Sequence, residues 1–196
     1  MNRLGTSIDL AVEHLQQGQI VAFPTETYYG LAVDPQNESA VKKLFELKKR
    51  PVDKPLLLLI EDVGQLPQLS SSVPEEFQPL IEKYWPGPLT LIFPALPSVN
   101  PKITAETGTV GIRISPHPVA KKIVERFGRA ITATSANISG LDPAKTAQEV
   151  IDMFGEYIDF VLDGGGTTAG LCSTVVGVKD SHLQVIRAGV IDIFSS

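Results

Sequence analysis

Apolar residues along the chain follow two spacings, and each spacing predicts one kind of element. Apolar positions that recur every three to four residues predict helices, whereas short apolar runs bounded by turn residues predict buried strands. The first spacing predicts helices at residues 7–15, 38–48, 74–84, 118–127 and 147–154. The second predicts strands at residues 19–23, 56–60, 89–93, 109–114, 130–133, 159–162, 173–178 and 183–187.

The order of these elements predicts the fold class. Helices alternate with strands early in the chain, and strands cluster near its end, which is typical of an α/β fold with a mixed parallel and antiparallel sheet. Helix starts carry capping residues: Thr6 or Ser7, Asn37, and Thr146 in a capping box. The last two strands form a hairpin around Ser181, and residues 98–108 are expected to be a loop.

Composition narrows the class of protein. The chain has 196 residues, of which 43% are hydrophobic and 20% charged, so it is a globular protein of one domain or two small ones. A single cysteine excludes an internal disulfide. The net charge of −5 argues against a globally basic nucleic-acid binder but leaves a local basic cleft open. With no secretory signal and no apolar run near the roughly 20 residues of a membrane span, we expect a cytoplasmic protein.

Polar segments follow several predicted strands and helices, where ligand sites of α/β proteins lie. The run from Lys48 to Pro55 holds four cations at a helix end, which fits either the helix dipole or a phosphate clamp. The run from Ala133 to Gly140 is either an ordinary turn or an anion site. Arg113, inside an apolar strand, has either a structural ion pair or a ligand carboxylate as its partner.

Other motifs carry less chemistry. The glycine run at 164–166 follows a strand but precedes another strand, so a Rossmann dinucleotide site is rejected and a flexible or phosphate-binding loop remains. Cys172 has no histidine near it in sequence and is interpreted as an inert thiol. His117, between two prolines at a helix start, is interpreted as structural. The pattern indicates a site that binds charged ligands and contains no nucleophile.

Six segments taken together resemble one family. They are Phe23 to Leu31 (FPTETYYGL), Lys48 to Pro51 (KKRP), Trp85 to Thr90 (WPGPLT), Thr109 to Arg113 (TVGIR), Ser135 to Gly140 (SANISG) and Ser173 to Val176 (STVV). In this order they resemble the YrdC/TsaC family, the L-threonylcarbamoyladenylate synthases, over about residues 8–191. The resemblance implies a single YrdC-like domain over residues 1–196, with a twisted mixed sheet, flanking helices and a deep positively charged cleft.

The resemblance also implies an activity. L-threonine, bicarbonate and ATP would give threonylcarbamoyl-AMP and pyrophosphate, with Mg2+ expected on the phosphates. The product would serve N6-threonylcarbamoyladenosine synthesis at position 37 of tRNA through a separate transferase complex, and direct tRNA binding is left open. Matching positions imply catalytic Lys48 and Arg50, further ATP contacts from Thr109, Ser135, Asn137, Ser173 and Arg187, and threonine contacts from Thr27, Arg113 and Ala133. No metal-ligating side chain and no general base for the threonine ammonium is identified.

The chain departs from the family pattern at three positions. Leu59 stands where some long members carry a histidine near threonine, and Cys172 and Gly177 stand where many members have Glu and Asp. Two other functions stay open: a non-catalytic module that binds double-stranded RNA or tRNA, and an enzyme that transfers a carbamoyl group from carbamoyl phosphate. The net charge of −5 speaks against the first, and the intact Ser135-Ala136-Asn137 motif speaks against the second.

Overall fold

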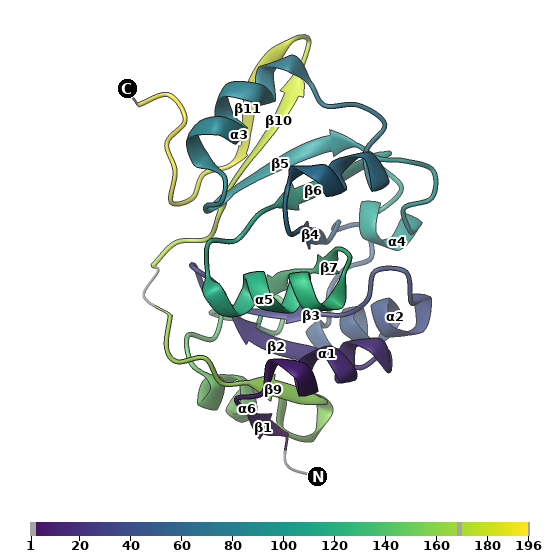
Figure 1. The fold of residues 1–196 in the computed structure, drawn as a ribbon, viewed down its shortest axis with the longest axis vertical. Helices are drawn as coiled ribbons and strands as arrows, with labels where there is room; N and C mark the ends of the chain where they lie inside the picture. The colour runs from purple at the N-terminus through teal and green to yellow at the C-terminus, as the bar shows by residue number, and fades with distance from the viewer. Residues whose placement is uncertain (1–2, 168–169, 196) are drawn as a thin grey trace.

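A computed structural model describes residues 3–167 and 170–195, and its strands form two sheets. The strands are β1 (Leu4–Gly5), β2 (Val21–Pro24), β3 (Tyr29–Ala32), β4 (Leu57–Leu59), β5 (Leu89–Pro94), β6 (Thr109–Arg113), β7 (Ile131–Thr132), β8 (Thr134–Ser135), β9 (Phe160–Leu162), β10 (Thr174–Lys179) and β11 (His182–Arg187). One sheet has the order β1-β9-β2-β3-β8, and the other has the order β11-β10-β5-β6-β4-β7. The two sheets occupy the lower and upper parts of the molecule in Figure 1.

Both sheets are mixed, as predicted. In the first, β9 is parallel to β1 and β2, whereas β3 is antiparallel to β2 and β8. In the second, β10 runs parallel to β5 and antiparallel to β11, which forms the predicted terminal hairpin. Its turn residues Asp180 and Ser181 both have positive φ, the geometry of a two-residue hairpin turn. The division into two sheets was not predicted, because the sequence pattern does not say which strands pair.

The α-helices are α1 (Ile8–Gln16), α2 (Glu38–Lys48), α3 (Gln78–Tyr84), α4 (Pro101–Thr104), α5 (Pro118–Phe127) and α6 (Ala147–Phe154); short 3-10 helices cover Val63–Gln68, Glu75–Phe77 and Gly155–Tyr157. The predicted caps are confirmed. The side chains of Ser7, Asn37 and Thr146 accept hydrogen bonds from backbone N–H groups in the first turns of α1, α2 and α6.

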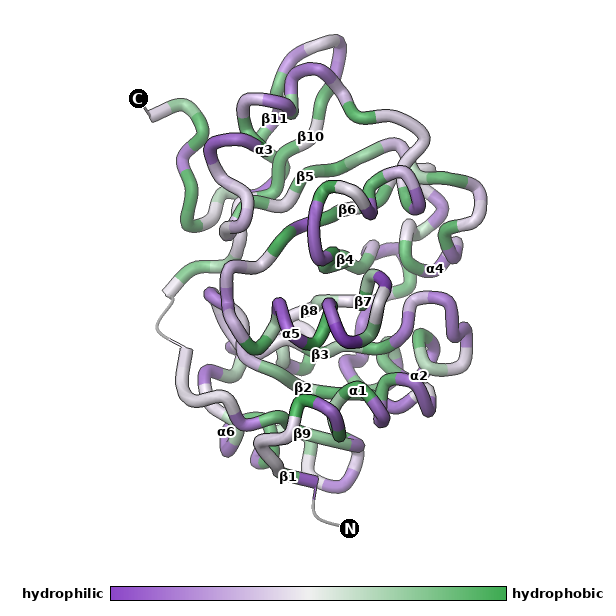
Figure 2. The backbone as a smooth tube through the Cα atoms, viewed as in Figure 1, coloured by the Kyte–Doolittle hydropathy of each residue, from purple (hydrophilic) through white to green (hydrophobic). Residues whose placement is uncertain are grey.

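Helices α1 and α5 pack against each other and against strands of both sheets. Their buried residues, such as Leu15 and Ile123, share a cluster with Phe23 of the lower sheet and with Leu59 and Ile131 of the upper sheet. Figure 2 shows strands such as β2 and β5 as mostly hydrophobic segments, while α5 alternates between hydrophobic and hydrophilic residues. This alternation places one apolar side of α5 on the core, in a cluster shared with residues of both sheets.

Several segments differ from the sequence predictions, and the helix predicted at 74–84 is a 3-10 helix at Glu75–Phe77 followed by α3. The expected loop at 98–108 contains the short helix α4, capped by the Asn100 side chain. The polar segment after β2 turns back at once into β3, so it forms a hairpin. The predicted strand at 130–133 continues to Ser135 as two short strands.

The segment from β7 to β8 passes from one sheet to the other. Strand β7 pairs with β4 of the upper sheet, and β8 pairs with β3 of the lower sheet. Ala133 lies between them and donates its N–H to the carbonyl oxygen of Leu57 at 2.8 Å. Residues 131–135 therefore connect the two sheets, and the candidate site lies beside them.

Within residues 3–167 and 170–195, none of the helices combines the length and the apolar character that crossing a membrane requires.

Candidate functional site

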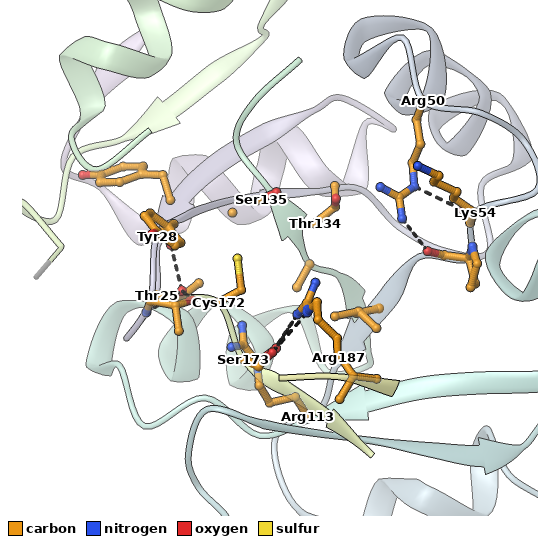
Figure 3. Close-up of a pocket in the computed structure, with 17 residues that line it drawn as sticks. Thr25, Tyr28, Arg50, Lys54, Arg113, Thr134, Ser135, Cys172, Ser173 and Arg187 are labelled. Atoms are coloured by element: carbon orange, nitrogen blue, oxygen red, sulfur yellow. Dashed lines mark hydrogen bonds between the residues drawn. The ribbon is translucent and has the colours of Figure 1, made fainter. Parts of the chain in front are cut away.

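A cavity of about 270 Å³ lies between the two sheets (Figure 3). Four cationic residues line it, Arg50, Lys54, Arg113 and Arg187, and no carboxylate does among the described residues. The remaining lining includes hydroxyl groups from the β2–β3 connection, from β8 and from the start of β10. Arg50 and Lys54 enter from one side in Figure 3, and Arg113 and Arg187 from another. Such a lining suits an anionic ligand.

The turn between β2 and β3 forms one wall of the cavity. The hydroxyl of Thr25 donates to the carbonyl oxygen of Tyr28 at 2.7 Å and accepts the N–H of Thr27 at 3.2 Å. The two threonine hydroxyls are 3.1 Å apart. This local network fixes the turn, so that Thr27 and Tyr28 line the cavity.

Tyr29, also in the lining, joins this wall to the glycine run. Its hydroxyl donates to the carbonyl oxygen of Gly165 at 2.8 Å and accepts the N–H of Gly164 at 3.4 Å. Burial raises the pKa of Tyr29 to about 12, so the phenol stays protonated. Part of the glycine run is thus held beside the site; Thr168 and Ala169, which follow it in the predicted glycine motif, lie outside the described residues.

Arg187 is held against the start of β10. Its Nε and Nη2 donate to the carbonyl oxygen of Ser173 at 3.2 and 2.8 Å, and Nη2 also donates to the Ser173 hydroxyl at 3.1 Å. That hydroxyl lies 3.0 Å from the hydroxyl of Thr90 on β5. The hairpin β10–β11 thus brings Arg187 and Ser173, fourteen residues apart in sequence, to the cavity.

Arg50 follows the end of α2 and is anchored by the next loop. Lys49 has a left-handed conformation (φ 49°) that ends the helix. The Arg50 guanidinium donates to the carbonyl oxygens of Lys54 and Pro55 at 3.2 and 2.8 Å. Burial and the charge of Arg187 lower the pKa of Arg50. Arg50 and Arg187 therefore lie close enough to repel each other, and an anion between them would relieve this repulsion.

Lys48 lies behind the cavity wall. Its side chain is buried, with 1% exposure, and Nζ donates to the carbonyl oxygens of Ser135 and Asn137 and, at 3.2 Å, to Asn137 Oδ1. Burial, and secondly the charge of Arg50, lower the pKa of Lys48 to about 7. All three N–H donors of the ammonium are thus paired with protein oxygens, and Lys48 is not in the cavity lining.

Asn137 is likewise satisfied within the protein. Its Oδ1 accepts from the Ser135 hydroxyl at 2.5 Å, and its Nδ2 donates to the carbonyl oxygens of Ile138 and Leu141. Asn137 therefore shapes the loop that presents Ser135 to the cavity.

Arg113 stands at the end of β6 and is almost fully buried. Its Nη1 forms an ion pair with Glu26 Oε1 at 2.7 Å. Of the two partners that the sequence left open, the structural ion pair is therefore present. Burial lowers the pKa of Arg113, and Glu26 opposes this shift.

The structure brings most of the predicted site residues together. The cavity lining contains Thr27, Arg50, Arg113, Ala133, Ser135, Ser173 and Arg187. It does not contain Lys48, Asn137 or Thr109. Thr109 is at the other end of β6 from Arg113, about 13 Å away at the usual rise per residue, with its hydroxyl 2.9 Å from that of Thr107.

Several cavity residues were not predicted as site residues, among them Thr25, Tyr28, Lys54 and Cys172. Lys54 belongs to the cationic run that the sequence analysis singled out, and its spacing from Arg50 could have identified it. Cys172, interpreted as inert, lines the cavity. His117 caps α5, where its Nδ1 accepts the N–H of Val119 at 3.3 Å, in agreement with its predicted structural role.

A metal site was not predicted. Across the described ranges, no three or more His, Cys, Asp or Glu residues form a group that could hold a metal ion. The cavity therefore offers cations and hydroxyl groups to a ligand.

Comparisons with known proteins identify the family of the chain. A family model described as "Telomere recombination" (Sua5, YciO and YrdC) matches residues 13–189. A threonylcarbamoyl-AMP synthase of Pyrococcus abyssi is 41% identical over 182 residues, which are 93% of this chain and 54% of the relative. One of an Enterobacter species is 40% identical over 84% of this chain and 86% of the relative.

A solved structure has the same fold. Sua5 of P. abyssi, complexed with L-threonine, has a TM-score of 0.89 at 41% identity over 93% of this chain and 54% of that chain. This chain spans about half the length of the P. abyssi protein. The family model covers most of the chain, and the two relatives have sequence identities of 41% and 40%. The predicted resemblance is therefore confirmed: the chain belongs to the Sua5/YciO/YrdC family.

Proposed function

We propose that the protein is a threonylcarbamoyl-AMP synthase, which condenses L-threonine, bicarbonate and ATP and releases pyrophosphate. The observation that carries the proposal is the cavity lined by four cationic residues and by no described carboxylate. ATP and the threonine carboxylate are both anionic, so this cavity suits them. The names of the two relatives and the L-threonine complex of P. abyssi Sua5 support the same reaction.

The two substrates would share the cavity. Arg113 would bind the threonine carboxylate, with Thr27 and the Ala133 backbone beside it. Arg50, Ser135, Ser173 and Arg187 would bind ATP. Together the four cations would make the cleft positively charged, as the sequence predicts. This assignment follows the sequence prediction for residues that line the cavity.

Lys48, Asn137 and Thr109 are outside the cavity lining, so the proposal assigns them no direct contact with ATP. Lys48 and Asn137 were expected to contact ATP, and their hydrogen bonds support an indirect role, through the loop that carries Ser135. An ATP contact by Thr109 remains a prediction, which the lining of the cavity does not support.

The reaction itself requires positioning more than covalent catalysis. The threonine amine adds to CO2 derived from bicarbonate, loses a proton and becomes a carbamate. A carbamate oxygen then forms a bond to the α-phosphorus of ATP, and the bond from that phosphorus to the bridging oxygen of pyrophosphate breaks. Arg50 and Arg187 would stabilise the charge that develops on the phosphoryl oxygens.

Mg2+ would enter with ATP as part of the substrate. The cavity lining has no described carboxylate that could hold a resident ion. We therefore assign the metal no protein ligand and no separate step.

We further propose that the product passes to a separate threonylcarbamoyl transferase complex that modifies tRNA, in the cytoplasm. We also propose that residues 1–196 form one domain with its core at about 8–191. Strands from both halves of the chain enter each sheet, which supports one folding unit.

Pyrophosphate release tests the function. ATP and bicarbonate are supplied with L-threonine, with L-serine, or without an amino acid, to wild type, Arg50→Ala and Lys42→Ala. Lys42 is exposed on α2 and serves as the matched control. We expect release that depends on L-threonine and falls on the order of 100-fold in Arg50→Ala. Folded wild-type protein without threonine-dependent release would exclude the proposal and direct the work to RNA binding or carbamoyl phosphate.

A further inference from the structure

Glu26 sits in the turn that carries the proposed threonine contact, but it is outside the cavity lining. Thr25, Thr27 and Tyr28 line the cavity, and Glu26 does not. The Thr25 hydrogen bonds that fix this turn also fix the backbone of Glu26. The carboxylate of Glu26 thus contacts Arg113, a lining residue, without lining the cavity itself.

The two oxygens of this carboxylate differ, since Oε1 forms an ion pair without a hydrogen bond among the described residues and Oε2 accepts a hydrogen bond. Oε1 lies 2.7 Å from Arg113 Nη1, and the side chains are 13% and 6% exposed. Oε2 accepts a hydrogen bond from the hydroxyl of Ser115, and this hydroxyl accepts the N–H of His117 at 3.2 Å. A chain of contacts thus runs from the start of α5 through Ser115 and Glu26 to the guanidinium.

Arg113 needs such a counter-ion. It is buried and close enough to Arg187 for that charge to lower its pKa, whereas Glu26 raises it. Among the described residues, Glu26 is the one acidic group in an ion pair with Arg113. Arg113 Nε and Glu26 Oε1 are both buried without a hydrogen-bond partner among these residues, so charge is the main link between the two side chains.

We propose that Glu26, supported by Ser115, is a positioning residue that holds the Arg113 guanidinium in the orientation that receives the ligand carboxylate. This inference rests on the proposed function, in which Arg113 binds L-threonine. Glu26 would not touch the substrate. Its removal would change the affinity for the carboxylate ligand and leave ATP binding, which is assigned to Arg50, Ser135, Ser173 and Arg187, unchanged.

Four variants test the inference: Glu26→Gln, Ser115→Ala, Arg113→Lys, and Glu125→Gln as a control, since Glu125 is exposed on α5. For each, KM for L-threonine, KM for ATP and kcat come from pyrophosphate release. Calorimetry of L-threonine binding without turnover gives an independent readout, and the melting temperature reports folding.

We expect Glu26→Gln to raise KM and Kd for L-threonine on the order of 10-fold and to leave KM for ATP within twofold. Ser115→Ala, which removes one hydrogen bond and keeps the ion pair, should raise KM for threonine about threefold. If Glu26→Gln does not fold, the threonine KM of Ser115→Ala tests the positioning role instead. Glu125→Gln should match wild type.

Two results would overturn the inference: a threonine KM within twofold of wild type in both Glu26→Gln and Ser115→Ala, or equal rises in both KM values. If Arg113→Lys alone impairs threonine binding, only the positioning role fails. If wild type shows no threonine-dependent release, the proposed function fails with it.

Discussion

Nζ of Lys48 donates a hydrogen bond of 2.7 Å to the carbonyl oxygen of Asn137, which joins the last residue of α2 to the loop after β8. The same loop returns a bond, because the N–H of Ser139 donates to the carbonyl oxygen of Lys48 at 2.8 Å. Two segments about ninety residues apart thus form one wall, and Ser135 at its edge faces the cavity.

This relationship predicts that Lys48→Met destabilises the fold. Methionine keeps the apolar stem but removes the hydrogen bonds to three oxygens of the loop and leaves the carbonyl oxygen of Asn137 without the lysine donor, at a cost of about 3 kcal/mol in the free energy of unfolding. Urea unfolding measures it. Lys42→Met on the exposed face of the same helix should change stability by less than about 0.5 kcal/mol. Wild-type stability of Lys48→Met would show that the ammonium does not hold this loop.

The pH dependence of stability should also reflect Lys48. Its pKa in the folded protein is about 7, below its ordinary value of 10.5. Between these values the unfolded chain binds a proton that the folded protein does not, so the free energy of unfolding rises with pH, by at most about 1.4 kcal/mol per unit. Below pH 7 both states are protonated and this slope disappears.

Urea unfolding of wild type and Lys48→Met between pH 7 and pH 9 measures this contribution. Wild type should gain about 1–2 kcal/mol more than the variant over this interval. Parallel pH profiles would contradict the lowered pKa.

Gly189 should be required by its close approach to the start of β10. A Cβ atom there would lie 2.3 Å from the carbonyl oxygen of Cys172 and 2.6 Å from the backbone nitrogen of Thr174. We expect Gly189→Ala to displace Ser173 and to lower both the melting temperature and the affinity for ATP. Gly166→Ala is the control for loss of a glycine, since its φ is not left-handed and its added Cβ would come no closer than 3.9 Å to the carbonyl oxygen of Lys145. A variant Gly189→Ala with wild-type ATP affinity would contradict this close packing.

Arg187 should contribute to ATP binding more than to stability. It is exposed on the edge strand β11, and its bonds go to Ser173 beside the cavity. Arg187→Ala should raise KM for ATP on the order of 10- to 100-fold and lower the melting temperature by only a few degrees. Steady-state kinetics and thermal unfolding measure the two effects. A large loss of stability with normal KM would assign Arg187 a structural role.

The local elements could be predicted from the sequence, because their signals are local. Helix α2 has the predicted bounds, since Asn37 caps its start and apolar residues follow at helical spacing. Arg113 was predicted to have a charged partner, because a buried charge within an apolar strand needs one. Its partner Glu26 could not be identified, because only the folded chain brings the two together.

The cluster of site residues could be predicted in part. Ser135 and Ser173 follow the family pattern and line the cavity. The positions of Lys48 and Asn137 behind the wall could not be predicted. The sequence does not show whether a lysine at a helix end faces solvent, a ligand or the carbonyl groups of a neighbouring loop. Pairing of β7 and β8 with different sheets also depends on contacts distant in sequence.

The interleaving of the two sheets has a consequence for how the chain folds during synthesis. Strand β9 lies between β1 and β2, so β1 has no neighbour in its sheet until residue 162 has been made. Strand β5 likewise lacks its neighbour β10 until the residues from Thr174 onward have been made. Pairings across such sequence distances fold slowly and leave strand edges open meanwhile. The cavity is therefore among the last features to form, because it is complete only when Arg187 has left the ribosome.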